Sequence, residues 1–145
     1  TISCYSLIDV ARRAAPMMAE GRTILTLTYQ GSNRVTPFYN VMGVAKAALE
    51  STVRYLAHDL GPDGIRVNAI SPGPMKTLAG AAIGGTRKTF KTTQANAPLR
   101  ENATLEAIGG TAVYLASDYG KCTTGETVIV DGGFHVLGMM QPENL

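Results

Sequence analysis

The sequence predicts an α/β fold in which short buried strands run parallel and alternate with helices. Three apolar runs of strand length, at 24–28, 65–71 and 126–133, are separated by segments with apolar residues at three- and four-residue steps. Apolar strands that alternate with helices are typical of parallel sheets, whose crossover connections are right-handed. The length of 145 residues fits one domain, and we expect no second one.

The first predicted helix covers 6–19, where apolar side chains fall near one face. Pro16 lies in its last turn, where a proline disfavours helical structure, and Gly21 is typical of a residue that follows a helix end. The first strand, at 24–28 (ILTLT), is short, apolar and partly β-branched, which is typical of a buried strand. A polar loop at 29–33 follows it.

The longest predicted helix covers 37–60, with an apolar residue at nearly every third or fourth position. Thr36 is placed to cap this helix, and Pro37 suits its first turn. The sequence Gly-Pro-Asp-Gly at 61–64 ends it. The second strand, at 65–71 (IRVNAIS), comes directly afterwards.

Proline and glycine at 71–74 (SPGP) break the second strand. The segment 75–97 is rich in Gly, Ala, Thr and Lys and has weak periodicity, which predicts a mobile loop carrying one or two short helices. A further helix is predicted at 104–117 despite its paired glycines. The third strand, at 126–133, ends in a turn.

Composition excludes several functional classes. Thirteen basic against eleven acidic residues give a net charge of +2, too balanced for nucleic-acid binding. No apolar run approaches the roughly 18 residues of a membrane helix, and no signal peptide is visible, so we expect a cytoplasmic protein. Cys4 and Cys122 are expected to be reduced thiols. The motifs of nucleophilic and metal hydrolases are absent from the sequence.

Ligands of open α/β sheets bind beyond the carboxyl ends of the strands, which directs attention to the residues after each strand. Tyr39 and Lys46, seven residues apart, would leave one face of the predicted helix about 10 Å apart along its axis. A nearby ammonium should lower the pKa of the tyrosine, and such a pair can donate a proton to a developing oxyanion. From spacing alone, two side chains that merely share a solvated face remain the simpler alternative.

Other candidates follow the strands. Tyr29 stands at the end of the first strand, where a packed ring with its hydroxyl on the backbone is the ordinary structural alternative. Exposed N–H groups at 71–74 could bind an amide or a phosphate. The remaining candidates lack catalytic or metal spacing and are expected on the surface or in turns: His58, His135, Asp9, Asp59 and Asp131.

Two segments carry a family resemblance: LTLTYQGSNRVTPFYNVMGVAKAALESTVRYLAHDLGPDGIRVNAISPGPMKTLAG and ETVIVDGGFHVLGM. They resemble the short-chain dehydrogenase/reductase superfamily, and within it the bacterial enoyl-[acyl-carrier-protein] reductases. The superfamily pattern has three residues between tyrosine and lysine, whereas six separate Tyr39 from Lys46, with Tyr29 ten residues upstream. This spacing, with AKAALE and GPMKTLA, is specific to the enoyl reductase branch.

The resemblance runs through nearly all of the chain and implies the C-terminal part of a Rossmann-like, doubly wound parallel sheet. Residues 1–145 would form a partial domain that lacks the N-terminal βα units, and such a piece should be neither stable nor active alone. The missing part of the same protein is therefore an expected partner. The long helix would supply an interface in a homotetramer.

The implied activity is reduction of trans-2-enoyl-[acyl-carrier-protein] thioesters in fatty acid biosynthesis, by hydride transfer from NADH, with NADPH left open. Tyr39 would hydrogen-bond the thioester carbonyl and stabilise the enolate. Lys46 would hold the nicotinamide ribose hydroxyls, and Tyr29 would be a second active-site tyrosine. Two alternatives remain: a 3-oxoacyl-thioester reductase or other short-chain dehydrogenase, and an inactive fragment that retains only the oligomerisation surface.

The resemblance also assigns residues around the ligands. The backbone of Met75 would face the nicotinamide carboxamide, and Thr77 would face the pyrophosphate. Leu78 to about Thr89 would form the substrate-binding loop, and Met42 would line the acyl pocket. The implied cofactor-binding residues are Lys46, Met75, Lys76, Thr77, Leu78 and Ala79, and the implied substrate-binding residues are Tyr29, Tyr39, Met42 and Leu78.

Overall fold

A three-stranded parallel sheet in the order β1-β2-β3 forms the centre of the computed structural model, which describes residues 2–18, 21–75 and 86–144. The strands are β1 (Thr23–Leu27), β2 (Arg66–Pro72) and β3 (Thr127–Val130). Both pairings are parallel, with Ile24 opposite Val67 and Ile70 opposite Val128. The predicted parallel α/β arrangement is therefore confirmed.

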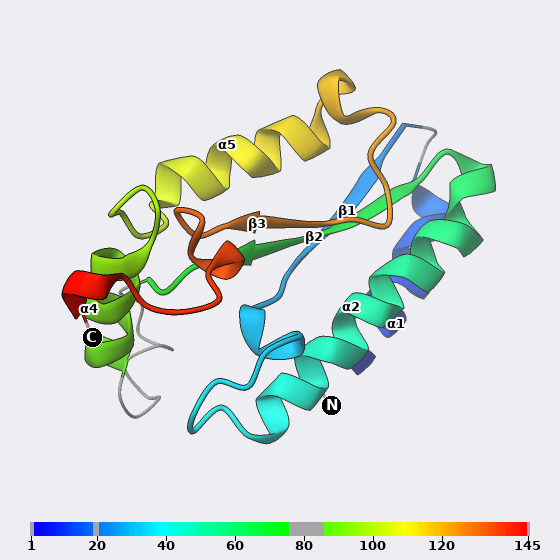
Figure 1. Cartoon of the computed structure of the whole chain (residues 1–145). Helices are drawn as coiled ribbons and strands as arrows, with labels where there is room; N and C mark the ends of the chain where they lie inside the picture. Colours follow the sequence, from blue (N-terminus) through cyan, green and yellow to red (C-terminus); the bar gives the residue numbers. More distant parts are fainter. Residues whose placement is uncertain (1, 19–20, 76–85, 145) are drawn as a thin grey trace.

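Helices cover both faces of the sheet (Figure 1). Helices α1 (Ile2–Ala14) and α2 (Val41–Leu60) pack together on one side, and α5 (Leu105–Ala116) lies on the other. Helix α4 (Thr86–Asn96) lies near the carboxyl ends of the strands, beside the C-terminus of the chain (Figure 1). Among the described residues, none of the helices combines the length and the apolar character needed to cross a bilayer.

The core lies between α2 and the sheet. Val53 of α2 and Val67 of the central strand are each 0% exposed, because α2 lies directly on β2. The buried cluster and the half-buried side chains packed on it are Val53, Ala57, Val67, Ala69, Leu7, Ile24, Leu56 and Leu60. β2 is buried along almost its whole length because it has a neighbour on each edge and helices on each face.

Several predicted boundaries were wrong for local reasons. The first helix begins at Ile2 and ends at Ala14, after which Pro16 lies in a 3₁₀ turn. The third strand stops at Val130 rather than at 133, because the two glycines that follow Asp131 have positive φ values of 67° and 84° and turn the chain. Within 75–97, by contrast, the expected short helix is confirmed as α4, which has 11 residues.

The predicted start of the longest helix was also wrong. Helix α2 begins at Val41, not at 37, and Thr36 is not its N-cap. Phe38 and Asn40 have positive φ values of 67° and 47°, which no α-helix permits. Tyr39 therefore lies in the turn before α2, so it does not share a helix with Lys46.

Arg66, at the start of β2, ties the end of α5 to the sheet. It is 9% exposed, and its guanidinium donates hydrogen bonds to the carbonyls of Leu115 (2.6 Å) and Gly120 (2.9 Å). A longer bond of 3.4 Å reaches the carbonyl of Ser117. A cation among the last carbonyls of a helix is stabilised by their partial negative charge. No local pattern marks this residue, because the carbonyls that it binds lie 49 and 54 residues away in the sequence.

Candidate functional site

Three predicted site residues meet at the carboxyl end of β1. The strand ends at Leu27, whose carbonyl accepts a hydrogen bond from Lys46 Nζ at 2.9 Å. Two residues later, the Tyr29 ring packs against the ring of Tyr39, with centroids 5.1 Å apart and planes inclined by 59°. Tilted rings at this separation attract each other through their quadrupoles. The structure thus gathers Tyr29, Tyr39 and Lys46 around one strand end.

Their convergence does not arise from a shared helix face, as predicted, but from a loop that folds back. The Tyr39 N–H donates to the carbonyl of Thr36 at 3.1 Å, and the Tyr39 carbonyl accepts from Met42 N–H at 3.0 Å. A Cβ at Gly31 would lie 2.5 Å from the ring carbon Cδ1 of Tyr39. The absence of a side chain at Gly31 therefore lets the ring lie against the loop backbone.

Substituting alanine for Gly31 should displace the Tyr39 ring. We expect Gly31→Ala to lower the free energy of unfolding by about 1–3 kcal/mol and to change the near-ultraviolet circular dichroism of the packed tyrosines. Gly109→Ala is the matched control, because a Cβ there meets nothing within 4 Å. Alanine favours the helix more than glycine does, so this variant should raise the free energy of unfolding by up to about 1 kcal/mol. Equal effects of the two substitutions would contradict this packing.

Burial favours the protonated form of both phenols. The pKa of Tyr39 is raised by burial and, to a smaller extent, by Tyr29 beside it. Burial also raises the pKa of Tyr29, and the hydrogen bond from Gln30 Nε2 (3.3 Å) partly offsets this. The prediction that Lys46 would lower the pKa of Tyr39 was wrong, because its amine lies on the Leu27 carbonyl and burial dominates. Tyr39 is therefore a neutral hydrogen-bond donor.

The Tyr39 phenol should keep its proton beyond the ordinary tyrosine value. The difference in phenolate absorbance between the wild-type protein and Tyr39→Phe is expected to rise only above pH 10.0, the ordinary value. The sign follows from burial, which disfavours the charged phenolate. A difference spectrum that develops below that pH would show that a nearby cation controls this tyrosine instead.

Lys46 lies at the margin of a second feature, a hollow along β1 of about 500 Å³. Residues 25–27 of β1 line it on one side, and Ile108 and Ala112 of α5 lie on another. Burial lowers the pKa of Lys46, and the carboxylate of Glu50 opposes this shift. The ammonium has three donors, one of which points to the Leu27 carbonyl, so its chemistry suits neighbouring hydroxyl groups of a ligand.

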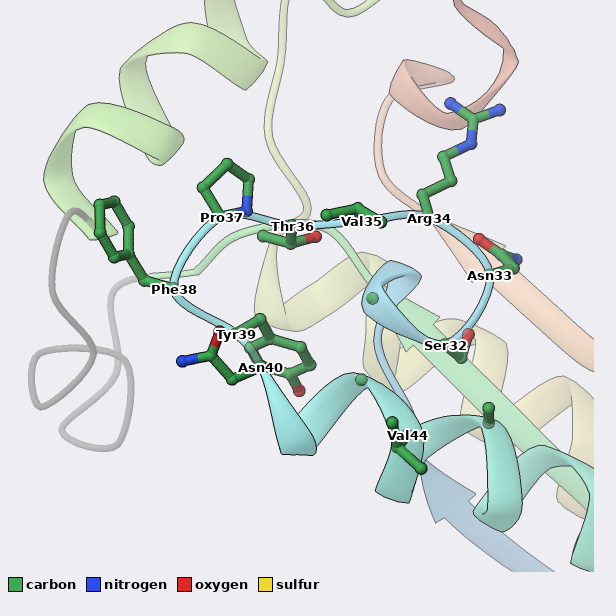
Figure 2. Close-up of a pocket in the computed structure, with 13 residues that line it drawn as sticks. Ser32, Asn33, Arg34, Val35, Thr36, Pro37, Phe38, Tyr39, Asn40 and Val44 are labelled. Atoms are coloured by element: carbon green, nitrogen blue, oxygen red, sulfur yellow. The ribbon is translucent and has the colours of Figure 1, made fainter.

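The loop before α2 encloses a pocket of about 480 Å³. It is lined by 31–40 together with Gly43, Val44 and Ala47. Figure 2 shows this loop curving round the pocket, with the Tyr39 ring above the start of α2 and the Phe38 side chain turned outward. Arg34 fastens the loop to the C-terminal segment through a 3.3 Å bond to the carbonyl of Leu137.

Of the other predicted ligand-binding residues, the described part of the chain includes Met75 and Met42. Met75 is half-buried and follows β2 at the same edge of the sheet, where Gly73 N–H bonds the Val130 carbonyl at 2.8 Å. Met42 is 42% exposed in the first turn of α2. Lys76, Thr77, Leu78 and Ala79, and the predicted substrate-binding loop up to residue 85, lie outside the described residues.

The expectation that Asp131 is a surface or turn residue was incomplete, and His135 has a partner. Asp131 lies in the turn after β3 but is only 5% exposed, and its carboxylate accepts from the backbone of Gly133 (2.9 Å) and His135 (2.8 Å). It also contacts the ring Nδ1 of His135 at 2.9 Å. An aspartate followed by two glycines favours such a turn, and this was the available signal. His58 and Asp59 are exposed as expected.

Potential metal ligands and thiols are dispersed in the part of the chain that the structure describes. No group of three His, Cys, Asp or Glu side chains there is arranged to hold a metal ion. Cys4 and Cys122 are free, and Cys4 Sγ lies 3.1 Å from the hydroxyl of Thr52 where α1 packs on α2. The polar groups that converge are instead a phenol pair and an amine.

Known proteins are similar to this chain in sequence. The family model described as enoyl-(acyl carrier protein) reductase matches residues 1–135. A protein of Rhizobium meliloti (strain 1021) named enoyl-[acyl-carrier-protein] reductase [NADH] 2 is 56% identical over 144 residues, which are 99% of this chain and 54% of that protein. The chain thus spans about half the length of the curated relatives that it matches.

Solved structures agree in fold. The enoyl-(acyl-carrier-protein) reductase of Anaplasma phagocytophilum, in complex with NAD, superposes with a TM-score of 0.90 at 51% identity, over 97% of this chain and 52% of that one. The Bacillus cereus enoyl-acyl carrier protein reductase, with NADP+ and indole naphthyridinone, superposes with a TM-score of 0.92 at 52% identity. This match covers 94% of this chain and 53% of that one. These matches confirm the predicted Rossmann-like fold and family resemblance. The chain belongs to the enoyl-(acyl carrier protein) reductase family.

Proposed function

We propose that the protein containing this chain reduces trans-2-enoyl-[acyl-carrier-protein] thioesters with NADH in fatty acid biosynthesis. The convergence of Tyr29, Tyr39 and Lys46 at the end of β1 carries this proposal, since it places a phenol and an amine at the ligand-binding edge of a parallel sheet. The relatives' names specify NADH, and solved relatives hold NAD or NADP+.

Lys46 is the proposed holder of the cofactor ribose. Its amine stands at the strand end, and the Leu27 carbonyl orients it there while its other donors suit ribose hydroxyls. Met75 leaves β2 at the same edge, where its backbone is proposed to meet the carboxamide. The proposed cofactor segment continues through Lys76, Thr77, Leu78 and Ala79. When bound, the nicotinamide supplies the hydride.

Tyr39 is the proposed oxyanion donor. Its neutral phenol donates a hydrogen bond to the thioester carbonyl oxygen, and this bond strengthens as negative charge develops on that oxygen in the enolate. Tyr29 packs against the ring and fixes its place at 5.1 Å between centroids. Met42, in the first turn of α2, is proposed to contribute apolar surface for the acyl chain, as is Leu78.

A partner segment is also proposed. Within the described sheet β1 pairs only with β2, which leaves its other edge open, and the hollow at that edge exposes Leu25 and Leu27. We assign this edge to the N-terminal part of the same protein, which would supply further strands. Relatives of about twice this length have room for such strands. Exposed Val41, Val44 and Tyr55 on α2 support a homotetramer interface, and we expect the protein in the cytoplasm.

The deciding assay offers the full-length protein crotonyl and acetoacetyl thioesters, each with NADH and with NADPH, and follows oxidation of the nucleotide. We expect turnover of the crotonyl thioester. Turnover of the acetoacetyl thioester alone would identify a 3-oxoacyl reductase instead. For the chain of residues 1–145 by itself we expect no NADH binding by calorimetry, with binding restored when the N-terminal part is added.

Removing the Lys46 amine should weaken cofactor binding. We expect Lys46→Ala to raise the NADH dissociation constant about 10- to 100-fold, because charge-assisted hydrogen bonds are worth about 1.5–3 kcal/mol each. Lys121→Ala removes an exposed lysine from the loop before β3 and serves as the control. Calorimetric titration of the full-length variants measures both. An unchanged dissociation constant in Lys46→Ala would refute the proposed role.

A further inference from the structure

A short hydrogen bond beside Lys46 has no part in the mechanism above. Thr28 is 3% exposed, and its hydroxyl donates to the Glu50 carboxylate oxygen Oε1 at 2.7 Å. Bonds of this length are typical of a hydroxyl on a charged carboxylate. The Thr28 N–H is itself held by the Ile70 carbonyl at 2.9 Å, so the hydroxyl has a fixed place on the sheet. The Glu50 carboxylate is therefore anchored to the end of β1.

Glu50 lies one helical turn after Lys46 on α2, so both side chains leave the same face of the helix and are within reach of each other. The amine nevertheless donates to the Leu27 carbonyl, while the carboxylate accepts from Thr28. Leu27 and Thr28, adjacent at the strand end, thus bind the amine and the carboxylate separately. A carboxylate released from Thr28 would be free to pair with the amine and draw it along the helix.

The charge of Glu50 also acts on the amine. Burial lowers the pKa of Lys46, and Glu50 is the neighbour that raises it. The phenols of Tyr29 and Tyr39 carry no countercharge for the amine at neutral pH, and burial raises the pKa of both. Among the described residues lining the hollow, Lys46 carries the only charge. The residues of α1 and α5 that line it are uncharged: Ser3, Ser6, Ile108, Gly109 and Ala112.

We propose that Thr28 and Glu50 are positioning residues for Lys46. The Thr28 hydroxyl holds the Glu50 carboxylate near enough to act as a countercharge, but keeps it from capturing the amine, which stays at the strand end. There it can reach a ligand hydroxyl. This inference rests on the proposed function only in naming the cofactor ribose as that ligand.

The direct test titrates the Lys46 amine in the full-length protein without nucleotide, by competitive acetylation at a series of pH values and peptide mass spectrometry. We expect Glu50→Gln to lower the pKa of Lys46, because the amide still accepts from Thr28 but carries no charge. Thr28→Val should raise the pKa of Lys46, because the released carboxylate pairs with the amine. Thr28→Ser and the control Asp59→Asn, an exposed carboxylate of α2, should leave it unchanged.

The opposite signs separate positioning from simple structural support. If Glu50→Gln and Thr28→Val both leave the Lys46 titration unchanged, or move it in the same direction, the proposal is overturned. Glu50→Gln keeps the hydrogen bond, so it tests the charge even if Thr28→Val does not fold.

Cofactor affinity provides the second readout. Thr28→Val should raise the NADH dissociation constant about fivefold at neutral pH, as expected for loss of the amine to a partly exposed ion pair. Adding Glu50→Gln to this variant should restore most of the affinity, whereas a further loss would count against the proposal. If the wild-type protein binds no NADH while the Lys46 titration shifts as expected, the positioning stands and the proposed cofactor role fails.

Discussion

Tyr39→Phe should reduce kcat for the crotonyl thioester about 100- to 1,000-fold, the usual cost of removing one oxyanion donor. The substitution deletes the hydroxyl but retains the ring, so the packing on Tyr29 at 5.1 Å is preserved. Because the proposed hydrogen bond strengthens as charge develops on the carbonyl oxygen, the loss should appear in kcat more than in KM. The NADH dissociation constant should change little.

Steady-state kinetics and calorimetry on the full-length protein measure these quantities. Tyr119→Phe is the matched control, since Tyr119 is 90% exposed in the turn between α5 and β3. Turnover by Tyr39→Phe equal to that of the control would remove Tyr39 from the mechanism. A fall in NADH affinity equal to the fall in kcat would assign the phenol to cofactor binding instead.

Arg66→Met should strongly destabilise this fold and lower the free energy of unfolding by about 3 kcal/mol. Methionine has a similar volume but cannot donate, so the carbonyls of Leu115 and Gly120 lose bonds of 2.6 and 2.9 Å in a buried place. Unsatisfied buried acceptors are costly because water cannot replace the lost donor. The connection between the end of α5 and β2 should loosen.

The measurement is thermal or denaturant unfolding of the full-length protein, in which a loss of this size lowers the midpoint by about 6–12 °C. Arg54→Met, at an exposed position of α2, is the control and should shift the midpoint little. Arg66→Lys keeps the charge with fewer donors and should lie between Arg66→Met and the wild type. A midpoint for Arg66→Met within a degree or two of the control would show that these bonds contribute little.

Much of the fold was predictable because its signals are local. Each strand is a short apolar run bounded by glycine, proline or polar residues, and each was placed to within a few residues. The parallel arrangement follows from their alternation with helices. The family was recognisable from the six residues between Tyr39 and Lys46 and the motifs around them, since these are contiguous letters of the sequence.

The residues that meet at the end of β1 were predictable from the sequence, but their geometry was not. Tyr29, Tyr39 and Lys46 were all selected, yet the helix that was meant to align two of them starts after Tyr39. Positive φ values at Phe38 and Asn40 are costly locally. They persist because the loop packs the Tyr39 ring against Gly31 and Tyr29.

The sequence by itself determined a parallel α/β fold and its family, and it selected residues that meet at the end of β1, because periodicity, turn residues and motifs are properties of neighbouring positions. Only the tertiary structure decided that burial raises the pKa of Tyr39 and that Lys46 rests on the Leu27 carbonyl. It alone joined Thr28 to Glu50, 22 residues away. Desolvation and long-range hydrogen bonds depend on which segments meet in space, and no local pattern encodes that.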